Sequence, residues 1–182
     1  MEKIITRNLY LRELSINDIT SSYINALNDP EIVILTGARH KQWNKENVKR
    51  YVIESNIRNV SQLIGIFLKK NDKHIGNIRL FNFNFHHKRV ELGIMIFDKT
   101  EWSKGYGTES LNAISIYVFK TLKLHRICAD YYAINIGSAK IFKKVGFIVE
   151  GIFKDHFILN GKYVDSIRVA KLDFKEGEKN EY

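Results

Sequence analysis

Three strand-like runs follow one another between residues 62 and 97, and the connections between them are too short to contain a helix. The runs cover residues 62–69, 74–83 and 88–97, with turns expected at residues 71–73 and 86–88. Strands joined by such short connections pair antiparallel. The middle of the chain is therefore predicted to form an antiparallel meander.

Helical periodicity begins directly after the meander. Apolar or small residues recur there at the spacing of one helix face: Leu111, Ile114, Ser115, Val118 and Leu122. This spacing predicts an amphipathic helix over residues 105–122. A strand at residues 126–133 and a helix at residues 135–145 are expected next, with Gly146 ending the helix. A last strand pair is expected around Asn160-Gly161, a dipeptide typical of two-residue hairpin turns.

The N-terminal third is predicted to combine one strand with helices. Residues 8–14 alternate apolar and polar side chains, which favours a strand. Ser15 and Asp18 approximate a capping box, so a helix is expected to start there. Further helix starts are expected at Asp29-Pro30 and at Asn44, the latter helix running to about residue 60. The full order is β, α, α, β, β, β, α, β, α, β, β, which predicts a mixed α/β fold with one βαβ crossover.

The length and composition fit one globular domain. With 182 residues, of which 45% are hydrophobic and 27% charged, the chain can bury a core and is not disordered. One Cys, Cys128, excludes a disulfide framework and a Cys-based zinc cluster. Charges interrupt the first residues and no 18-residue apolar run occurs, so neither a signal peptide nor a membrane span is expected. We expect a cytoplasmic protein with one domain over residues 1–174 and a frayed tail at residues 175–182.

The net charge of the chain indicates which classes of binding partner to consider. The chain has 29 Lys and Arg against 20 Asp and Glu, a formal net charge of +9. Such an excess attracts polyanions, so nucleic acid and a multiply phosphorylated cofactor are both candidates, beside a merely solvated basic face.

The sequence WSKGYGTE at residues 102–109 carries the most chemical information. It follows a predicted strand and opens a predicted helix. Gly105 and Gly107 allow close approach of a ligand to the backbone, the first amides of the helix lack partners, and Lys104 adds a cation. These features suit a diphosphate. The stretch matches neither the Walker pattern nor the dinucleotide fingerprint, since Ser110 replaces the third glycine, and in isolation an ordinary helix start explains it equally well.

The surrounding stretches resemble the GNAT superfamily of N-acetyltransferases, in particular its ribosomal-protein-alanine, spermidine and amino-sugar acetyltransferases. The resemblance covers nearly the whole chain. It rests on NLYLREL at 8–14, HIGNIRL at 74–80, RVELGIMIF at 89–97, WSKGYGTE at 102–109, LHRICADYYAINIGSAKIFKKVGF at 124–147 and EGIFKDHFILNGKYVDS at 150–166. It implies a mostly antiparallel, twisted sheet of about seven strands, flanked by helices and splayed where the cofactor binds.

The resemblance also implies which residues bind the cofactor, acetyl-CoA. The strand end Ile94-Met95-Ile96 would pair with the pantetheine arm and polarise the thioester carbonyl. The loop would hold the diphosphate through Trp102, Ser103, Lys104, Gly105, Tyr106, Gly107 and Thr108. Asn135 and Ser138 would contact the arm from the other side, although both also suit the start of a helix. Trp102 replaces the usual Gln or Arg, as in many members of this subgroup.

Two further positions bear on the chemistry that the resemblance implies. Glu91 is the candidate general base that takes a proton from the amine, against the alternative of a strand carboxylate paired with Arg89 or Arg79. Phe142 stands near the cofactor where relatives often carry a Tyr that protonates the leaving thiolate. Water, Tyr132 or Ser138 would take over that task, or turnover would be poor.

The expected reaction is acetyl transfer from acetyl-CoA to a primary amine, by direct attack in a ternary complex. The acceptor would be an amino sugar, a polyamine or a protein N-terminus. No metal and no membrane are expected, nucleic acid only through a ribosomal substrate, and a homodimer is possible. The alternative is a basic module that binds CoA or RNA without catalysis.

Overall fold

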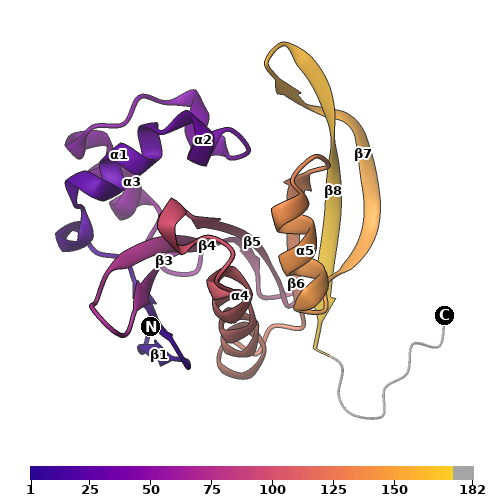
Figure 1. The fold of residues 1–182 in the computed structure, drawn as a ribbon. Coiled ribbons are helices and arrows are strands. Elements are labelled where there is room, and N and C mark those ends of the chain that lie inside the picture. The colour runs from indigo at the N-terminus through magenta and orange to yellow at the C-terminus, as the bar shows by residue number, and fades with distance from the viewer. Residues whose placement is uncertain (174–182) are drawn as a thin grey trace.

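A computed structural model describes residues 1–173 of the chain and contains one open sheet of eight strands (Figure 1). Their spatial order is β1-β2-β3-β4-β5-β6-β8-β7. The strands are β1 Ile4–Ile5, β2 Leu9–Glu13, β3 Ser61–Leu68, β4 His74–Asn84, β5 Arg89–Ile96, β6 Arg126–Tyr132, β7 Ile148–Leu159 and β8 Lys162–Leu172. All neighbours pair antiparallel except β5 and β6, which are parallel. The mixed α/β prediction is confirmed, with one strand more than expected because the short β1 adds an edge.

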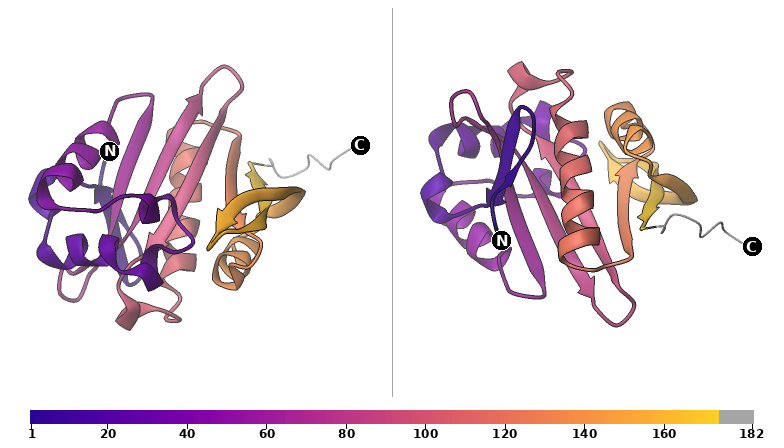
Figure 2. Two further views of the ribbon diagram at one scale, coloured as in Figure 1. Left: turned by 90° about the horizontal axis from the view of Figure 1, so that it is seen from above. Right: turned by 90° about the horizontal axis from the view of Figure 1, so that it is seen from below.

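Helices cover both faces of this sheet. They are α1 Ser21–Asn28, α2 Pro30–Val33, α3 Lys45–Glu54, α4 Tyr106–Ile116 and α5 Ile136–Lys144. The first three lie over one face and α4 over the other (Figure 2). Each face has its own apolar core, one shared by strands with α4 and α5 and one shared by strands with α1 and α3. Strand residues with side chains on opposite faces therefore face different environments.

Several helix boundaries differ from the predictions. Ser15 and Asp18 do form a capping box, but the element they start is a 3-10 turn at Ile16–Asp18, and Thr20 caps α1. The helix capped by Asn44 ends at Glu54 instead of near residue 60. Beyond α4 the chain continues as one π-helical turn at Tyr117–Thr121. No helix within residues 1–173 is long and apolar enough to cross a membrane. The expected tail, residues 175–182, lies outside the described residues.

The sheet opens between β5 and β6. Their pairing is limited to Arg89 with Arg126, Val90 with Ile127, and Glu91 with Cys128. Strand β5 runs on to Ile96 and β6 to Tyr132 without further pairing between them. The splay that the resemblance implied is thus present, and it begins one residue after Glu91.

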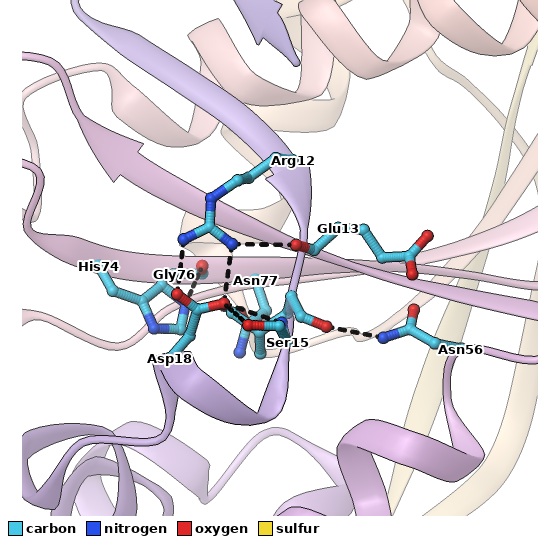
Figure 3. A network of polar contacts seen from close by, with 9 residues as sticks. Arg12, Glu13, Ser15, Asp18, Asn56, His74, Gly76 and Asn77 are labelled. Carbon is cyan, nitrogen blue, oxygen red and sulfur yellow. Dashed lines mark hydrogen bonds and ion pairs between the residues drawn. The ribbon is translucent and has the colours of Figure 1, made fainter. Parts of the chain in front are cut away.

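A polar network joins the end of β2 to the turn before α1 (Figure 3). The Arg12 guanidinium binds both carboxylate oxygens of Asp18, and the Ser15 amide and hydroxyl also donate to that carboxylate. Burial alone would raise the pKa of Asp18, but these donors more than offset it and lower the pKa to about 2. Asp18 therefore stays ionised and holds the turn before α1 against β2.

The His74 ring lies among Tyr23, Phe67 and Phe97, with ring centroids 4.8 to 5.1 Å away. Its Nε2 lies 3.0 Å from the Gly76 carbonyl oxygen and 2.8 Å from Asn77 Oδ1. Both partners are acceptors, since the Asn77 amide nitrogen donates to the Tyr23 hydroxyl, so the proton sits on Nε2. Nδ1 is buried without a partner. Burial is the main reason that the pKa of His74 falls to about 4.

We expect His74 to lower the stability of the folded protein as the pH becomes mildly acidic. An unfolded chain takes up the His proton near pH 6.5, whereas the folded chain takes it up only near pH 4. The free energy of unfolding should therefore be undiminished above pH 6.5 and fall by about 3 kcal/mol as the pH drops to about 4. Urea titrations across pH 4–7 measure this loss. His74→Gln should reduce this dependence of the free energy of unfolding on pH, whereas His86→Gln, at an exposed turn, should not. An equal pH dependence in the unmodified protein and both variants would contradict the role of His74.

Candidate functional site

The loop between β5 and α4 folds back onto the end of β5. The Trp102 indole Nε1 donates to the Ile96 carbonyl oxygen at 2.8 Å, although the ring is partly exposed. Lys104 forms a salt bridge of 2.8 Å with the buried Glu101 carboxylate, which raises the pKa of Lys104. Trp102 and Lys104 thus fix the loop directly in front of the first turn of α4.

The main-chain N–H groups of residues 103–108 have no hydrogen-bond acceptor among the described residues. The first intrachain bond of α4 runs from the Glu109 amide to the Gly105 carbonyl. Gly105 is the N-cap and has φ +85°, the left-handed region that a Cβ disfavours. Space around it is open, because a Cβ built there would meet no atom within 4 Å. Six successive N–H donors without acceptors therefore lie beside open space at the positive end of a helix dipole.

This arrangement fits a diphosphate group. Anions bind well where successive backbone N–H groups and a helix N-terminus converge, and Lys104 supplies a nearby cation. The carboxylate of Glu109, in the first turn of α4, does not compete, because it already accepts hydrogen bonds from Thr6 and Asn8. The predicted residues Ser103, Gly105 and Thr108 all belong to this one loop.

Helix α5 flanks the loop from the other half of the sheet. A Cβ built on Gly107 would lie 3.6 Å from the Ile141 side chain, so α4 and α5 approach closely there. Asn135 is the N-cap of α5, and its Oδ1 accepts from the Ser138 amide at 3.0 Å. The helix-start role of Asn135 is therefore present. Its amide nitrogen and the Ser138 hydroxyl have no hydrogen-bond partner within residues 1–173.

The end of β5 that pairs with β4 but not with β6 has half-buried side chains on both faces. Ile94 and Ile96 pack against the core beneath α4 and α5, while Met95 packs against the core beneath α1 and α3. Gly93, which precedes them, is exposed although β5 is a central strand, and a Cβ on it would meet nothing within 4 Å. The splayed half of the sheet is thus open on the face of α1 and α3.

Glu91 points to that open face, since its neighbours Val90 and Leu92 are buried in the other core. Its carboxylate lies 3.5 Å from the Arg168 guanidinium, which also holds Asp130 at 2.6 Å. The arginine partner is therefore Arg168 of β8 and neither of the two that the sequence suggested. Arg168 and Asp130 are site residues that sequence reasoning missed, because nothing in the local pattern links residues 77 and 39 positions away.

Two adjacent tyrosines of β6 point to opposite faces. Tyr132 is buried, stacks on Phe157 with ring centroids 4.1 Å apart and lies under the Arg39 guanidinium. Tyr131 stacks on Phe142 at 5.8 Å on the face of α5, and burial raises the pKa of its hydroxyl. Phe142 itself is buried in the core. Thus the structure brings Phe142 together with Tyr131 and not with Tyr132.

Comparison with known proteins gives a consistent match. The family described as "Acetyltransferase (GNAT) domain" matches residues 8–148. The uncharacterized N-acetyltransferase YnaD of Bacillus subtilis (strain 168) is 31% identical over 93% of this chain and 96% of its own length. The probable N-acetyltransferase YjcK of the same strain is 35% identical, but the match spans 60% of each chain. A structure of spermidine N-acetyltransferase from Vibrio cholerae with CoA and spermine has a TM-score of 0.80 at 23% identity, over 91% of this chain and 95% of that chain.

Proposed function

The chain belongs to the acetyltransferase (GNAT) domain family, and from this premise we propose that it transfers an acetyl group from acetyl-CoA to a primary amine. The observation that carries the proposal is the set of six unpartnered amides at residues 103–108, next to a sheet that opens after Glu91. The opening runs along β5 from Leu92 to Ile96, and the loop follows this same end of the strand.

In this proposal the loop binds the diphosphate of acetyl-CoA. The amides of residues 103–108 and the Lys104 ammonium would contact its oxygens, and Trp102 would hold the loop in place. The end of β5 that lacks a partner in β6, Ile94 to Ile96, would pair with the pantetheine arm, and Asn135 and Ser138 would face it from α5. When bound, the cofactor supplies an acetyl group activated as a thioester.

We assign proton transfer to groups on the open face. An alkyl ammonium is mostly protonated at pH 7, so the amine must lose a proton before it attacks. Glu91 would take it, directly or through water, with Arg168 holding the carboxylate in position. Phe142 has no hydroxyl to give the leaving thiolate a proton. Water, the Ser138 hydroxyl or a tyrosine hydroxyl of β6 would supply that proton. The sequence predicts Tyr132 for this role, but Tyr131 is the tyrosine that stacks on Phe142.

The remaining expectations stay predictions. These are the single domain over residues 1–174, the cytoplasmic location, a homodimer, and contact with nucleic acid through a ribosomal substrate. A non-catalytic module that binds CoA or RNA remains the alternative function.

Two measurements test the proposal. Acetyl-CoA at about 100 times its Kd should raise the melting temperature by about 5–10 °C, because only the folded chain offers the site. A panel of amino sugars, polyamines, amino acids and N-terminal peptides should release free CoA thiol with at least one amine. A melting shift without thiol release would favour the non-catalytic module, and no shift with either acetyl-CoA or CoA would contradict both functions.

A further inference from the structure

A cavity of about 320 Å³ opens beside Glu91, at the end of β5 opposite to the loop. Its polar lining comes from four strands: Asn82 and Asn84 of β4, Arg89 and Glu91 of β5, Cys128 of β6 and Arg168 of β8. None of residues 102–108 lines it. The volume is at the lower end of the range for pockets that hold small ligands. The cavity is therefore separate from the diphosphate site but includes the proposed base.

A bulge in β4 shapes one wall of this cavity. The pairing of β4 with β5 shifts between Phe81 and Asn84, and Asn82 has φ +52°. Bulges of this kind bend a strand and redirect its side chains, and they are common next to active sites. Asn84 Oδ1 accepts from the His87 amide, which fixes the end of the wall. Amide groups at this wall suit a ligand with hydroxyl or other polar substituents.

The cavity has one negatively charged site and one positively charged site. Arg168 is already bound to Asp130 and Glu91. This cluster of two carboxylates and one guanidinium leaves a net negative charge at Glu91. Arg89 lies on the same face of β5 and forms no salt bridge with a carboxylate among residues 1–173. Two residues along a strand span about 7 Å, so a cationic and an anionic subsite lie side by side.

We propose that this cavity binds the acceptor and selects a small amine that also carries an anionic group. The ammonium would face Glu91, and a carboxylate or phosphate would face Arg89 in a charge-assisted contact. This inference rests on the proposed acetyl transfer. A polyamine is disfavoured, because its second ammonium would approach Arg89 and gain no anionic partner there. Free amino acids and phosphorylated amino sugars share the required chemistry.

Paired acceptors test the anionic subsite. Thiol release is measured with glucosamine 6-phosphate against glucosamine, with alanine against alaninamide, and with spermidine. In at least one pair the anionic member should have a kcat/KM about tenfold higher, the effect of one charge-assisted hydrogen bond. The pair that shows the preference identifies phosphate or carboxylate as the anion. Spermidine should be slower than that preferred amine.

Arg89→Gln should abolish this preference by raising KM about tenfold while kcat changes little. Arg89→Lys should restore part of it. Arg58→Gln, which removes the same charge at an exposed position outside the cavity lining, should leave the preference intact. Melting curves establish that each variant is folded.

Other outcomes separate this inference from the proposed function. If spermidine or an N-terminal peptide is the best acceptor and Arg89→Gln leaves both pairs unchanged, the anionic subsite is wrong while acetyl transfer stands. If no amine releases thiol, acetyl transfer is wrong. In that case calorimetric titration of glucosamine 6-phosphate and of alanine into the CoA-saturated protein decides the subsite. Binding that Arg89→Gln weakens supports it, and the absence of binding overturns it.

Discussion

Glu91→Gln should lower the rate of amine-dependent thiol release by about 10²- to 10³-fold, the usual contribution of a positioned general base. The amide keeps the size and shape of the side chain but cannot accept the proton of the ammonium. Affinity for acetyl-CoA should not change, since Glu91 lies at the opposite end of β5 from the loop. Steady-state kinetics between pH 6 and pH 9 measure the effect. The deficit should shrink toward pH 9, where more of the amine is already unprotonated.

Glu150→Gln is a matched control for this experiment. Glu150 is also a strand carboxylate paired with an arginine, Arg126, but it does not line the cavity. Its replacement should leave the rate within about twofold of the unmodified protein, an effect of less than 0.5 kcal/mol. Full activity of Glu91→Gln over the whole pH range would show that another group, or water alone, takes the proton.

Gly105→Val should weaken acetyl-CoA binding by about 100-fold or more. A β-branched residue does not tolerate φ +85°, so the loop must change its backbone to accept the Val. The amides of residues 103–108 would then no longer keep the arrangement that the folded loop gives them. Losing two charge-assisted hydrogen bonds of about 1.5 kcal/mol each accounts for an effect of this size. The melting shift with acetyl-CoA, recorded over a concentration series, gives the affinity.

Gly146→Val is a control that distinguishes the effect of backbone strain on stability from the loss of acetyl-CoA binding. Gly146 ends α5 with φ +87°, and a Cβ there would also meet nothing within 4 Å. The substitution should lower the melting temperature about as much as Gly105→Val does, because both impose the same backbone strain of about 1–2 kcal/mol. Acetyl-CoA should still stabilise it normally. Equal binding by Gly105→Val and the unmodified protein would contradict the role of the loop.

Most of the fold could be predicted because its elements have strong local patterns. The alternation in β2, the strand-like runs of β3 to β5 and the helical spacing in α4 each extend over at least five residues, and Gly146 marks the end of α5. Strand β1 has only two residues, which is too short for such a pattern. The early end of α3 depends on Asn56, whose side chain binds the Leu14 carbonyl and the Leu63 amide and so turns the chain into β3. A contact of that kind is a tertiary effect that a local pattern does not contain.

The candidate site also has one part that the sequence predicts and one part that it does not. The loop at residues 102–108 could be predicted because its amides, glycines and lysine lie together in the sequence. The group around Glu91 could not, since Arg168 and Asp130 reach it only after β6 and β8 have paired. The charge distribution in the cavity likewise depends on which arginine already forms a salt bridge. The sequence offered Arg89 or Arg79 as the partner of Glu91, and Arg168 took that place, leaving Arg89 available for a ligand.

The three-pair junction of β5 and β6 has a consequence for how such proteins diversify. With so few backbone bonds across it, the spread of the two strands is governed by the volumes of side chains wedged beneath it, among them Val90, Leu92 and Ile127. One methylene more or less in that hidden layer would move the walls of the opening apart or together. A lineage could thereby adapt to a bulkier acyl chain or a wider nucleophile through positions that never touch either one.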